Sequence, residues 1–410
     1  MALVVFFVLL ILIYSLISKR LERSILTAPI VFSLAGFLGS LFFAELHLGE
    51  ESWEIFLTLA EVGLVFLLFS DSSRTNLDIL KNIKNLPARL LSTGMLLTIT
   101  LGGLVALVVF QKLSIWEAGI LAAILAPTDA GLGQIIVNSS RVPMKIRQAL
   151  NVEAGLNDGL SVPFLLFFIA LARTDITGNQ ASLAGYILEQ LGYGIIIGLA
   201  IGLTGGYLFR IFDRKKWIAH SWKQLGVVVL PLLCAVVSED IGASMFIASF
   251  VAGLSVQVGY KEAGKHSVEF TENWGQLINL SVFFFFGLLI ASNLNQFNIL
   301  HLIYAILSLT IIRLLPVAIS LVGTKLSKET VLFMGWFGPR GLASIVLGLV
   351  YLEQKAFLPG EDTIRLAVMA TVFISIFAHG FSALPAINIY SKKIHALSAN
   401  APENEIVKND

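Results

Sequence analysis

Charged residues are scarce in this sequence of 410 residues: 13% are Asp, Glu, Lys or Arg, whereas 56% are hydrophobic. Soluble domains carry roughly a quarter charged residues, so the composition excludes an ordinary soluble globular protein. The net charge of +1 offers no electrostatic basis for a nucleic-acid or strongly acidic partner. A single cysteine, Cys234, excludes an intrachain disulfide. The main solvent of this chain is therefore a lipid bilayer.

The N-terminal apolar run lacks the two marks of a secretory signal peptide. No basic stretch precedes it, and no small-residue cleavage site stands before Lys19. We therefore interpret it as the first of 13 apolar stretches, each near the roughly 20 residues that a spanning helix needs. They cover residues 2–18, 24–44, 55–70, 89–110, 115–136, 148–172, 184–209, 223–238, 243–259, 273–292, 299–322, 329–352 and 366–390. The sequence thus predicts an all-α polytopic membrane protein with 13 transmembrane helices.

The distribution of Lys and Arg among the loops tests this number of spans independently. Basic residues prefer cytoplasmic loops. With the N-terminus outside, the cytoplasmic segments hold 22 Lys or Arg and the outer loops hold 4. A miscounted helix would scramble this alternation from that point on. We therefore expect the N-terminus outside and the C-terminus in the cytoplasm.

Thirteen spans divide into two six-helix halves joined by a linking helix. Residues 1–390 form one membrane domain, with a first half at 1–172, the linking helix at 184–209 and a second half at 223–390. A cytoplasmic tail, 391–410, is expected to be disordered. The halves start seven spans apart, so they cross the membrane in opposite senses. Inverted repeats of this kind are common in secondary transporters, with the substrate site near the midplane.

A proline with neighbouring glycine interrupts the fifth span of each half. Span 5 contains Ala-Pro-Thr-Asp-Ala-Gly at 126–131, and span 12 contains Gly-Pro-Arg-Gly at 338–341. Proline removes a backbone donor and glycine relaxes a helix. Ordinary kinks are the alternative, because Pro and Gly are frequent in membrane helices. The matched positions, each with a charged residue, favour crossed discontinuous helices in spans 5 and 12.

Six charged residues lie inside the predicted spans, where a charge at the helix centre costs about 2.5–3.5 kcal/mol on insertion scales. They are Glu61, Asp129, Glu153, Asp158, Arg313 and Arg340. Such residues must face one another or water. Buried ion pairs that only fix helix packing are the alternative explanation. Four acids and two arginines, however, leave up to two carboxylates for a cation or a proton.

Span 6 places its polar residues on different sides of one helix. Glu153 and Asn157 are four residues apart, so they share a face and can hydrogen-bond along the helix. Asp158 is five residues from Glu153 and is turned roughly 140° away. By depth, Asp158 and Asp129 both fall near mid-membrane, as does Arg313. Asp158 can therefore face a cavity while Glu153 faces a structural partner.

The motifs of spans 5, 6 and 12 together resemble a known family. Glu-Ala-Gly-Leu-Asn-Asp-Gly at 153–159, Pro-Thr-Asp at 127–129 and Gly-Pro-Arg-Gly at 338–341 are similar to motifs of the cation/proton antiporter superfamily. The resemblance is greatest to the electroneutral sodium/proton antiporter branch, and span order extends it over the whole chain. It implies a transporter and not an enzyme, without a cofactor. It further implies a homodimer in a prokaryotic inner membrane that serves pH homeostasis.

The resemblance also implies roles for the residues around the first break. Asp158 would bind the transported cation and the proton in turn. Asn157 stands where electrogenic relatives have a second aspartate, and it would brace a buried ion pair. Thr128 would offer an oxygen from the unwound part of span 5. Asp129 would tune the site or compensate the broken helix ends.

Four further positions gain a role from the same resemblance. Glu153 and Arg313 would form the buried ion pair. Glu61, in Leu-Ala-Glu-Val-Gly, matches a family glutamate near the ion path. Arg340 would sit beside the helix breaks. Ala154 departs from the family pattern, because many relatives have a serine there and this chain offers no hydroxyl.

Elementary chemistry supports these roles. Na⁺ is a hard ion that binds carboxylate, hydroxyl, carbonyl and water oxygens. A carboxylate in a partly dry cavity loses hydration, which favours its protonated form. A proton and Na⁺ then compete for one site. We therefore expect electroneutral exchange of one Na⁺, or Li⁺, for one H⁺ by alternating access, with Asp158 as the ligand of the transported ion.

Other functions share part of this pattern. A K⁺/H⁺ antiporter of the same fold would carry nearly every feature, because selectivity depends on cavity geometry. An intramembrane aspartyl protease also needs two buried aspartates, but its Tyr-Asp and Gly-x-Gly-Asp motifs do not occur in this sequence. A channel fits less well, because broken helices with opposed charges suit alternating access better.

Overall fold

The computed structural model describes residues 2–21, 24–42, 50–74, 85–177, 185–186, 188–263, 276–354, 358–395 and 401–404. All regular structure in these residues is helical. The helices before residue 180 are α1 (Ala2–Leu21), α2 (Ala28–Phe42), α3 (Glu50–Arg74), α5 (Asn85–Arg89), α6 (Met95–Val109), α7 (Ile115–Ile124), α8 (Ala130–Val137) and α9 (Met144–Thr177). One π-helical turn, η1 (Leu90–Gly94), joins α5 to α6.

The rest of the described chain is built in the same way. Its helices are η2 (Leu188–Tyr193), α11 (Gly194–Arg214), α12 (His220–Ile241), α13 (Met245–Gly259), α15 (Gln276–Ser292), α16 (Ile299–Leu309), α17 (Ile311–Ser320), α18 (Lys328–Trp336), α19 (Leu342–Glu353) and α20 (Glu361–His395). Two short 3₁₀ turns complete it, η4 (Leu294–Gln296) and η5 (Pro402–Asn404).

The helices are apolar enough for a membrane protein. Within the described residues, eight helices are long and apolar enough to cross a bilayer. Five shorter apolar helices accompany them, in α2, α7, α13, α15 and α19. The all-α membrane class expected from the sequence is thereby confirmed. The number of 13 spans and the inverted repeats stay predictions.

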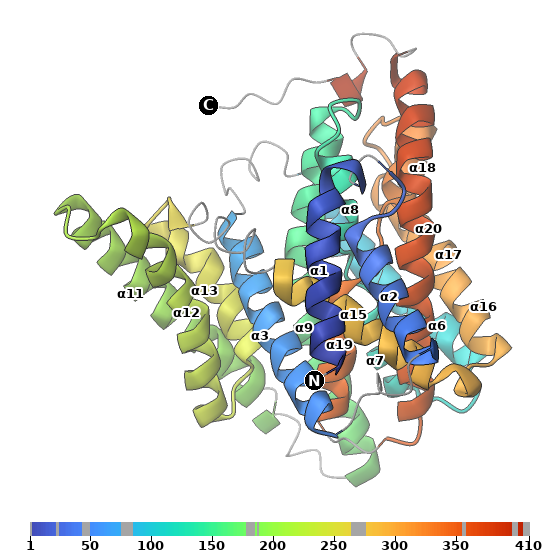
Figure 1. The fold of residues 1–410 in the computed structure, drawn as a ribbon, viewed down its shortest axis with the longest axis horizontal. Coiled ribbons are helices and arrows are strands. Elements are labelled where there is room, and N and C mark those ends of the chain that lie inside the picture. Colours follow the sequence, from blue (N-terminus) through green and yellow to red (C-terminus); the bar gives the residue numbers. More distant parts are fainter. Residues whose placement is uncertain are drawn as a thin grey trace.

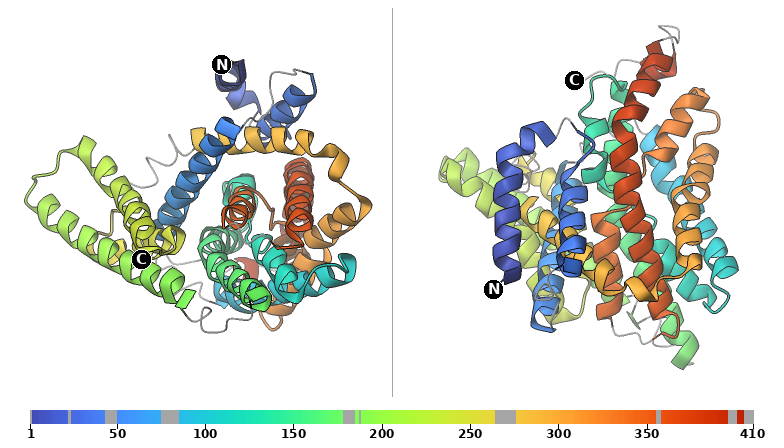
Figure 2. Two further views of the ribbon diagram at one scale, coloured as in Figure 1. Left: turned by 90° about the horizontal axis from the view of Figure 1, so that it is seen from below. Right: turned by 45° about the vertical axis from the view of Figure 1, so that its right-hand side comes forward.

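The helices form two groups with connecting helices between them (Figures 1 and 2). The group that we call the wing consists of α11, α12 and α13, with α11 and α13 packed along each other. The group that we call the core consists of α5 to α9 and α16 to α20. Between them, α3 contacts α13 on one side and α9 on the other, and α15 packs along α2. The buried charges described below lie in the core and at its boundary with α3.

One predicted span is bent into two helices. The span expected at 299–322 consists of α16 and α17, which meet at Thr310 with φ −112° and ψ −92°. The Thr310 hydroxyl donates to the Ile306 carbonyl oxygen at 2.6 Å. A threonine bonded to the carbonyl four residues earlier often bends a helix. The bend directs the following turn of α17, which carries Arg313, into the core.

Two described parts of the segment 391–410, which was predicted to be disordered, are helical: residues 391–395 and 402–404. Helix α20 continues past 390 to His395. Farther on, Glu403 is buried, and its Oε1 accepts hydrogen bonds from the Ser327 backbone N at 2.7 Å and the Thr330 hydroxyl at 2.9 Å. An acidic group at the first turn of a helix is favourable, because the amides there lack intrahelical partners. Glu403 therefore stabilises the start of α18.

Candidate functional site

Both predicted helix breaks are confirmed. The first separates α7 from α8 over residues 125–129, and the second separates α18 from α19 over 337–341. Pro127 and Pro339 lie in these non-helical segments, where a missing backbone N–H removes no helical hydrogen bond. The segments cross, because the Asp129 backbone N donates to the Pro339 carbonyl oxygen at 2.8 Å. Four helix ends therefore meet inside the core.

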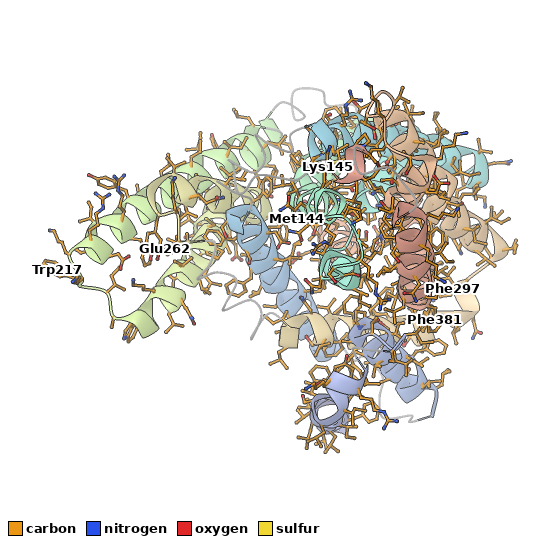
Figure 3. All side chains as sticks on the ribbon, turned by 90° about the horizontal axis from the view of Figure 1, so that it is seen from above. Met144, Lys145, Trp217, Glu262, Phe297 and Phe381 are labelled. Carbon is orange, nitrogen blue, oxygen red and sulfur yellow. The ribbon has the colours of Figure 1, made fainter. Side chains whose placement is uncertain are left out.

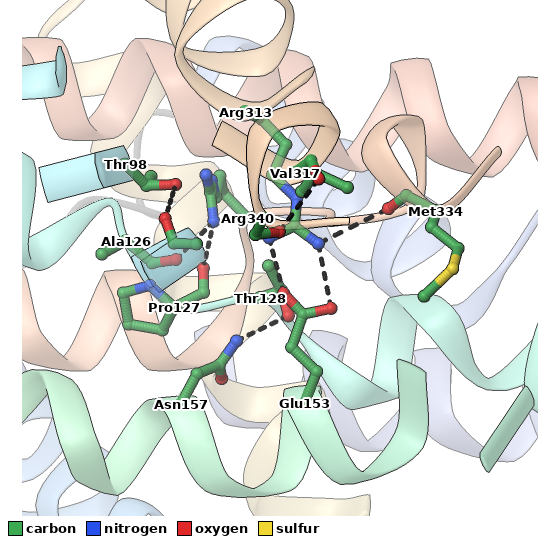
Figure 4. Close-up of polar contacts among 12 residues, drawn as sticks. Thr98, Ala126, Pro127, Thr128, Glu153, Asn157, Arg313, Val317, Met334 and Arg340 are labelled. Atoms are coloured by element: carbon green, nitrogen blue, oxygen red, sulfur yellow. Dashed lines mark hydrogen bonds and ion pairs between the residues drawn. The ribbon is translucent and has the colours of Figure 1, made fainter. Parts of the chain in front are cut away.

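Arg340 donates to two backbone carbonyls in the first break, just beyond the end of α7. Its side chain is fully buried, and Nη1 donates to the carbonyl oxygens of Ala126 at 2.6 Å and Pro127 at 2.8 Å (Figure 4). The last carbonyls of a helix have no intrahelical partner and carry partial negative charge. In a bilayer each unsatisfied group costs several kcal/mol. The guanidinium therefore stabilises the first break.

Asp129 accepts hydrogen bonds from the N-terminal turns of two helices, α8 and α19. Its Oδ1 accepts from the Leu132 backbone N at 2.8 Å and its Oδ2 from the Leu342 backbone N at 2.5 Å. A Cβ at position 341 would overlap this carboxylate, so the approach requires Gly341. Asp129 thus caps α8 and α19 together, although they are far apart in the sequence. This is the compensation of broken helix ends that the resemblance implied.

The carbonyl end of α18 is capped from α20. His379 Nε2 lies 2.9 Å from the Trp336 carbonyl oxygen, and its Nδ1 lies 3.1 Å from Ser375 Oγ. The Ser375 Oγ in turn accepts from the Arg340 backbone N at 2.7 Å. His379 Nδ1 also lies 2.9 Å from the Ser375 carbonyl oxygen. A proton on Nε2 lets His379 donate to Trp336, and a proton on Nδ1 lets it donate to Ser375. Sequence reasoning missed this role, and its one signal is the spacing of four residues between Ser375 and His379, which puts both on one helix face.

Glu153 and Arg313 form a buried ion pair with two parallel hydrogen bonds (Figure 4). Nη1 lies 2.6 Å from Oε1 and Nη2 lies 3.0 Å from Oε2, with both side chains at most 5% exposed. A Cβ at position 338 would overlap the guanidinium, so Gly338 makes room for the pair. Paired bonds of this geometry are among the strongest in proteins. Both carboxylate oxygens of Glu153 are therefore bonded to Arg313.

Asn157 lies differently from the expectation that it braces this ion pair. Its Nδ2 donates to Thr128 Oγ1 at 2.7 Å, which ties α9 to the first break (Figure 4). The physical reason is that Arg313 takes both oxygens of Glu153, while the broken span brings the Thr128 hydroxyl within reach. The Oδ1 of Asn157 is buried and has no hydrogen-bond partner among the described residues.

Asp158 is a buried acid of α9 without a basic partner in the described part of the chain. Its side chain is 3% exposed, and its Oδ1 has no hydrogen-bond partner there. The charged groups that act on it most strongly are two other carboxylates, Asp71 and Asp129. The adjacent Gly159 packs against the Phe250 ring of α13. Asp158 thus lies where the core meets α3 and the wing.

Asp71 belongs to this group and was missed from the sequence. A Cβ at position 155 would lie 3.4 Å from the Asp71 Cβ, which places this acid directly beside α9. The predicted span ended at 70, so Asp71 counted as a loop residue. In the structure α3 continues to Arg74. The only signal in the sequence is an acid directly after an apolar run, which is also typical of a solvated helix end.

Glu61 lies apart from this group. It precedes Asp71 by ten residues on α3, which is roughly 15 Å at 1.5 Å per residue. The charged neighbours that act on it are Glu353, at the end of α19, and Glu239, near the end of α12. The structure therefore gathers Asp158, Asp71, Thr128 and Asn157 at one place and leaves Glu61 nearer the opposite end of α3.

The fold and the buried charges define a class, membrane proteins with the antiporter fold. The sodium proton antiporter MjNhaP1 from Methanocaldococcus jannaschii, solved at pH 8, matches with a TM-score of 0.79 and 21% sequence identity, over 97% of this chain and 99% of that one. The family described as sodium/hydrogen exchanger, transmembrane, matches residues 5–388. The chain belongs to this sodium/hydrogen exchanger family, which confirms the resemblance to cation/proton antiporters.

Two similar proteins are named as antiporters, which agrees with this family, but their names give different cations. A K(+)/H(+) antiporter, NhaP, of Alkalimonas amylolytica is 27% identical over 90% of this chain and 63% of its own length. A Na(+)/H(+) antiporter of Schizosaccharomyces pombe is 26% identical over 68% of this chain and 65% of its own length. The chain thus spans just under two thirds of the length of these two relatives.

Proposed function

We propose that this protein exchanges one Na⁺ for one H⁺ at Asp158 by alternating access. The observation that carries the proposal is the difference in partners among three buried acids. Glu153 has an arginine and Asp129 has two helix ends, whereas Asp158 has neither among the described residues. An ionised buried carboxylate without a partner is costly. Binding either a proton or a cation removes that cost, so the two ions compete.

The oxygens around Asp158 suit an alkali cation as cargo. Asn157 contributes an amide oxygen without a partner among the described residues, and Thr128 contributes a hydroxyl from the break. Asp71 adds a carboxylate at the end of α3. Hard cations bind such oxygen ligands. Ala154 supplies no side-chain oxygen, so water or backbone carbonyls would complete the coordination.

The proposal includes the architecture expected from the sequence. The two broken spans stand at matching positions in two six-helix halves, which supports 13 spans arranged as inverted repeats. The excess of basic residues on alternate loops supports an N-terminus outside and a cytoplasmic C-terminus. We place the protein as a homodimer in a prokaryotic inner membrane, with pH homeostasis as its task.

K⁺ is the second candidate for the transported cation. The relative that covers 90% of this chain is named as a K(+)/H(+) antiporter. The two candidates share every residue of the site, so flux decides between them. Proteoliposomes with an imposed pH gradient are expected to exchange protons for Na⁺ and Li⁺ faster than for K⁺. The reverse order would replace Na⁺ by K⁺ and leave the role of Asp158 untouched.

The stoichiometry follows from the number of free carboxylates. Asn157 is neutral, Glu153 is paired with Arg313, and Asp129 caps two helices. Asp71 keeps its charge throughout in this proposal, so Asp158 alone changes its occupant in each cycle. One Na⁺ or one H⁺ gives the same local charge, and exchange should be indifferent to voltage, although moving one elementary charge through 100 mV is worth about 2.3 kcal/mol.

The test is exchange in proteoliposomes at a fixed pH gradient, with the potential clamped at zero and then at a large negative value by K⁺ and valinomycin. Equal rates and equal final Na⁺ gradients are expected. A shift of either with the potential would mean that a second charged group cycles. Asp129, next to Thr128, would then be the first to examine.

A further inference from the structure

The tip of the wing carries concentrated positive charge. The turn between α11 and α12 lies within residues 210–223, which contain five basic residues and one acidic residue. The exposed basic residues are Arg210, Arg214, Lys215 and Lys216. Figure 3 shows Trp217 of this turn at the outermost end of the wing, far from the core. The turn is therefore remote from the ion site and needs an explanation of its own.

The acidic residue of this segment does not neutralise the exposed cations. Asp213 forms an ion pair with Lys223 of α12 at 2.6 Å and accepts a hydrogen bond at 3.4 Å from the hydroxyl of Tyr260, the residue directly after α13. These contacts hold the three helices of the wing together. The four exposed basic side chains have no ion-pair partner among the described residues. They remain available to an anion from outside.

The turn has a defined backbone conformation that is unfavourable for one of its residues, Lys216. Lys216 has φ +56°, a conformation that disfavours L side chains. Its backbone N donates to Asp213 O at 2.9 Å, and Trp217 N donates to Phe212 O at 3.0 Å. The Trp217 and Phe212 rings pack at 5.5 Å between centroids. This is the Schellman ending of a helix, where glycine is the usual residue at the position of Lys216. The two hydrogen bonds and the ring contact therefore hold Lys216 and its neighbours in one defined turn.

Two tryptophans place the turn at a membrane surface. Trp217 is 70% exposed and Trp222 is 66% exposed. Apolar helices that can cross a bilayer lie on both sides of the turn, at Leu188–Arg214 and Trp222–Ile241. Tryptophan prefers the interface between hydrocarbon and water. The Lys215 ammonium lies 5.0 Å from the centre of the Trp217 ring, which holds this charge at the same depth.

We propose that this turn binds the headgroup of an anionic phospholipid. Arg214, Lys215 and Lys216 would bind the phosphate, and Trp217 and Trp222 would pack against the glycerol and the start of the acyl chains. Basic clusters next to a membrane span attract anionic lipids. A second copy of this chain fits the turn less well, because two such clusters facing each other repel. Orientation of the spans needs basic residues but neither two exposed tryptophans nor a lysine held against one of them, so the positive-inside preference does not account for the whole turn.

The test uses Lys216→Gly, which removes the charge and relieves the backbone. Binding of phosphatidylglycerol and phosphatidylcholine to the purified protein is measured by native mass spectrometry. The wild type is expected to prefer phosphatidylglycerol. The variant is expected to bind it about fivefold more weakly, as one basic residue at an anionic surface implies. Its melting temperature without lipid should equal or exceed that of the wild type, because glycine suits this position.

Lys325→Gly is the matched control. Lys325, in the loop between α17 and α18, is the other non-glycine residue with positive φ in the described chain, at +61°. This variant removes the same charge and relieves the same strain elsewhere, and it should leave phosphatidylglycerol binding unchanged. Equal losses in both variants, or no loss in Lys216→Gly, would overturn the site in favour of a general effect of charge. A change confined to the ratio of monomer to dimer would instead identify the turn as a contact between copies and overturn the proposal as well.

Discussion

Asp129 and Asp158 are both aspartates, both buried, at 7% and 3% exposure, and both close to the first helix break. Asp129 gives one oxygen to the start of α8 and the other to the start of α19. Asp158 has one oxygen without a hydrogen-bond partner among the described residues, and the charged groups that act on it most strongly are the carboxylates of Asp71 and Asp129. The comparison teaches that burial alone does not assign a role. A buried charge whose partners are backbone groups holds the structure together, and one without them is available for exchange.

Replacing each aspartate by asparagine tests this comparison most strongly. Asp158→Asn is expected to abolish Na⁺/H⁺ exchange in proteoliposomes while the melting temperature stays near the wild-type value, because no protein partner is lost. Asp129→Asn leaves one acceptor oxygen for two half-helices. It should lower stability by about 1–3 kcal/mol, the cost of an unsatisfied buried group. Near wild-type exchange by purified Asp158→Asn would remove Asp158 from the mechanism.

The Glu153–Arg313 ion pair adds a third case to this comparison, a buried carboxylate whose partner is a charged side chain. Glu153→Ala or Arg313→Ala should each cost about 3–5 kcal/mol of stability, because each leaves a buried charge unpaired. The double variant should lose less than the sum of the two, and thermal melts of all three proteins measure this coupling. Additive losses would show that the two residues do not depend on each other.

Variants of His379 test whether the C-terminal end of α18 needs the hydrogen bond that His379 makes to the Trp336 carbonyl oxygen. His379→Ala should cost about 0.5–1.5 kcal/mol, the worth of one hydrogen bond, because the Trp336 carbonyl oxygen then keeps only the Gly338 backbone N as its donor. Glutamine places its amide nitrogen near the position of Nε2, whereas asparagine places it near Nδ1. His379→Gln should therefore recover more of the melting temperature than His379→Asn. The opposite order would contradict the bond from Nε2 to Trp336.

Glu403 gives the smallest expected effect and one that depends on pH. Burial alone would raise the pKa of Glu403, but hydrogen bonds from the Ser327 amide and the Thr330 hydroxyl outweigh it and lower the pKa. A lowered pKa stabilises the fold above the unfolded value of about 4.3, and this stability is lost as the pH falls through the folded value. Glu403→Gln should thus melt lower than the wild type at neutral pH, by about 1 kcal/mol of stability. The two melting curves should converge on acidification, and a gap that persists in acid would contradict the role of the charge.

The sequence predicted structure best where the lipid bilayer restricts which backbone conformations are possible. Apolar runs must be helices in a bilayer, so each helix could be located to within a few residues. Proline alone does not predict a break, because four prolines lie inside helices α9, α12, α17 and α20. The two breaks could be predicted because Pro127 and Pro339 stand at matching positions, each with a glycine and a charged residue nearby. The pairing of Glu153 with Arg313 was accessible through the family resemblance, and the structure forms that pair.

Contacts across helices were not predictable, because helical spacing says nothing about the neighbouring helix. Asn157 shares a face with Glu153 but bonds to Thr128 on another segment. Asp71 was lost because the apolar run ends just before it, although the helix does not. Glu61 was assigned to the ion path through the family resemblance, and its separation from Asp71 by ten residues of helix could not be foreseen, because Asp71 was not among the predicted site residues.

The double cap of Asp129 couples the dynamics of two distant parts of the chain. Since one carboxylate bonds the amides of Leu132 and Leu342, neither half-helix can fray at its start without releasing a bond to the other. Local opening of α8 and α19 then becomes one cooperative event, and the two amides should exchange with heavy water at matching rates. We therefore expect the crossing to open as one unit and not as two independent helix ends.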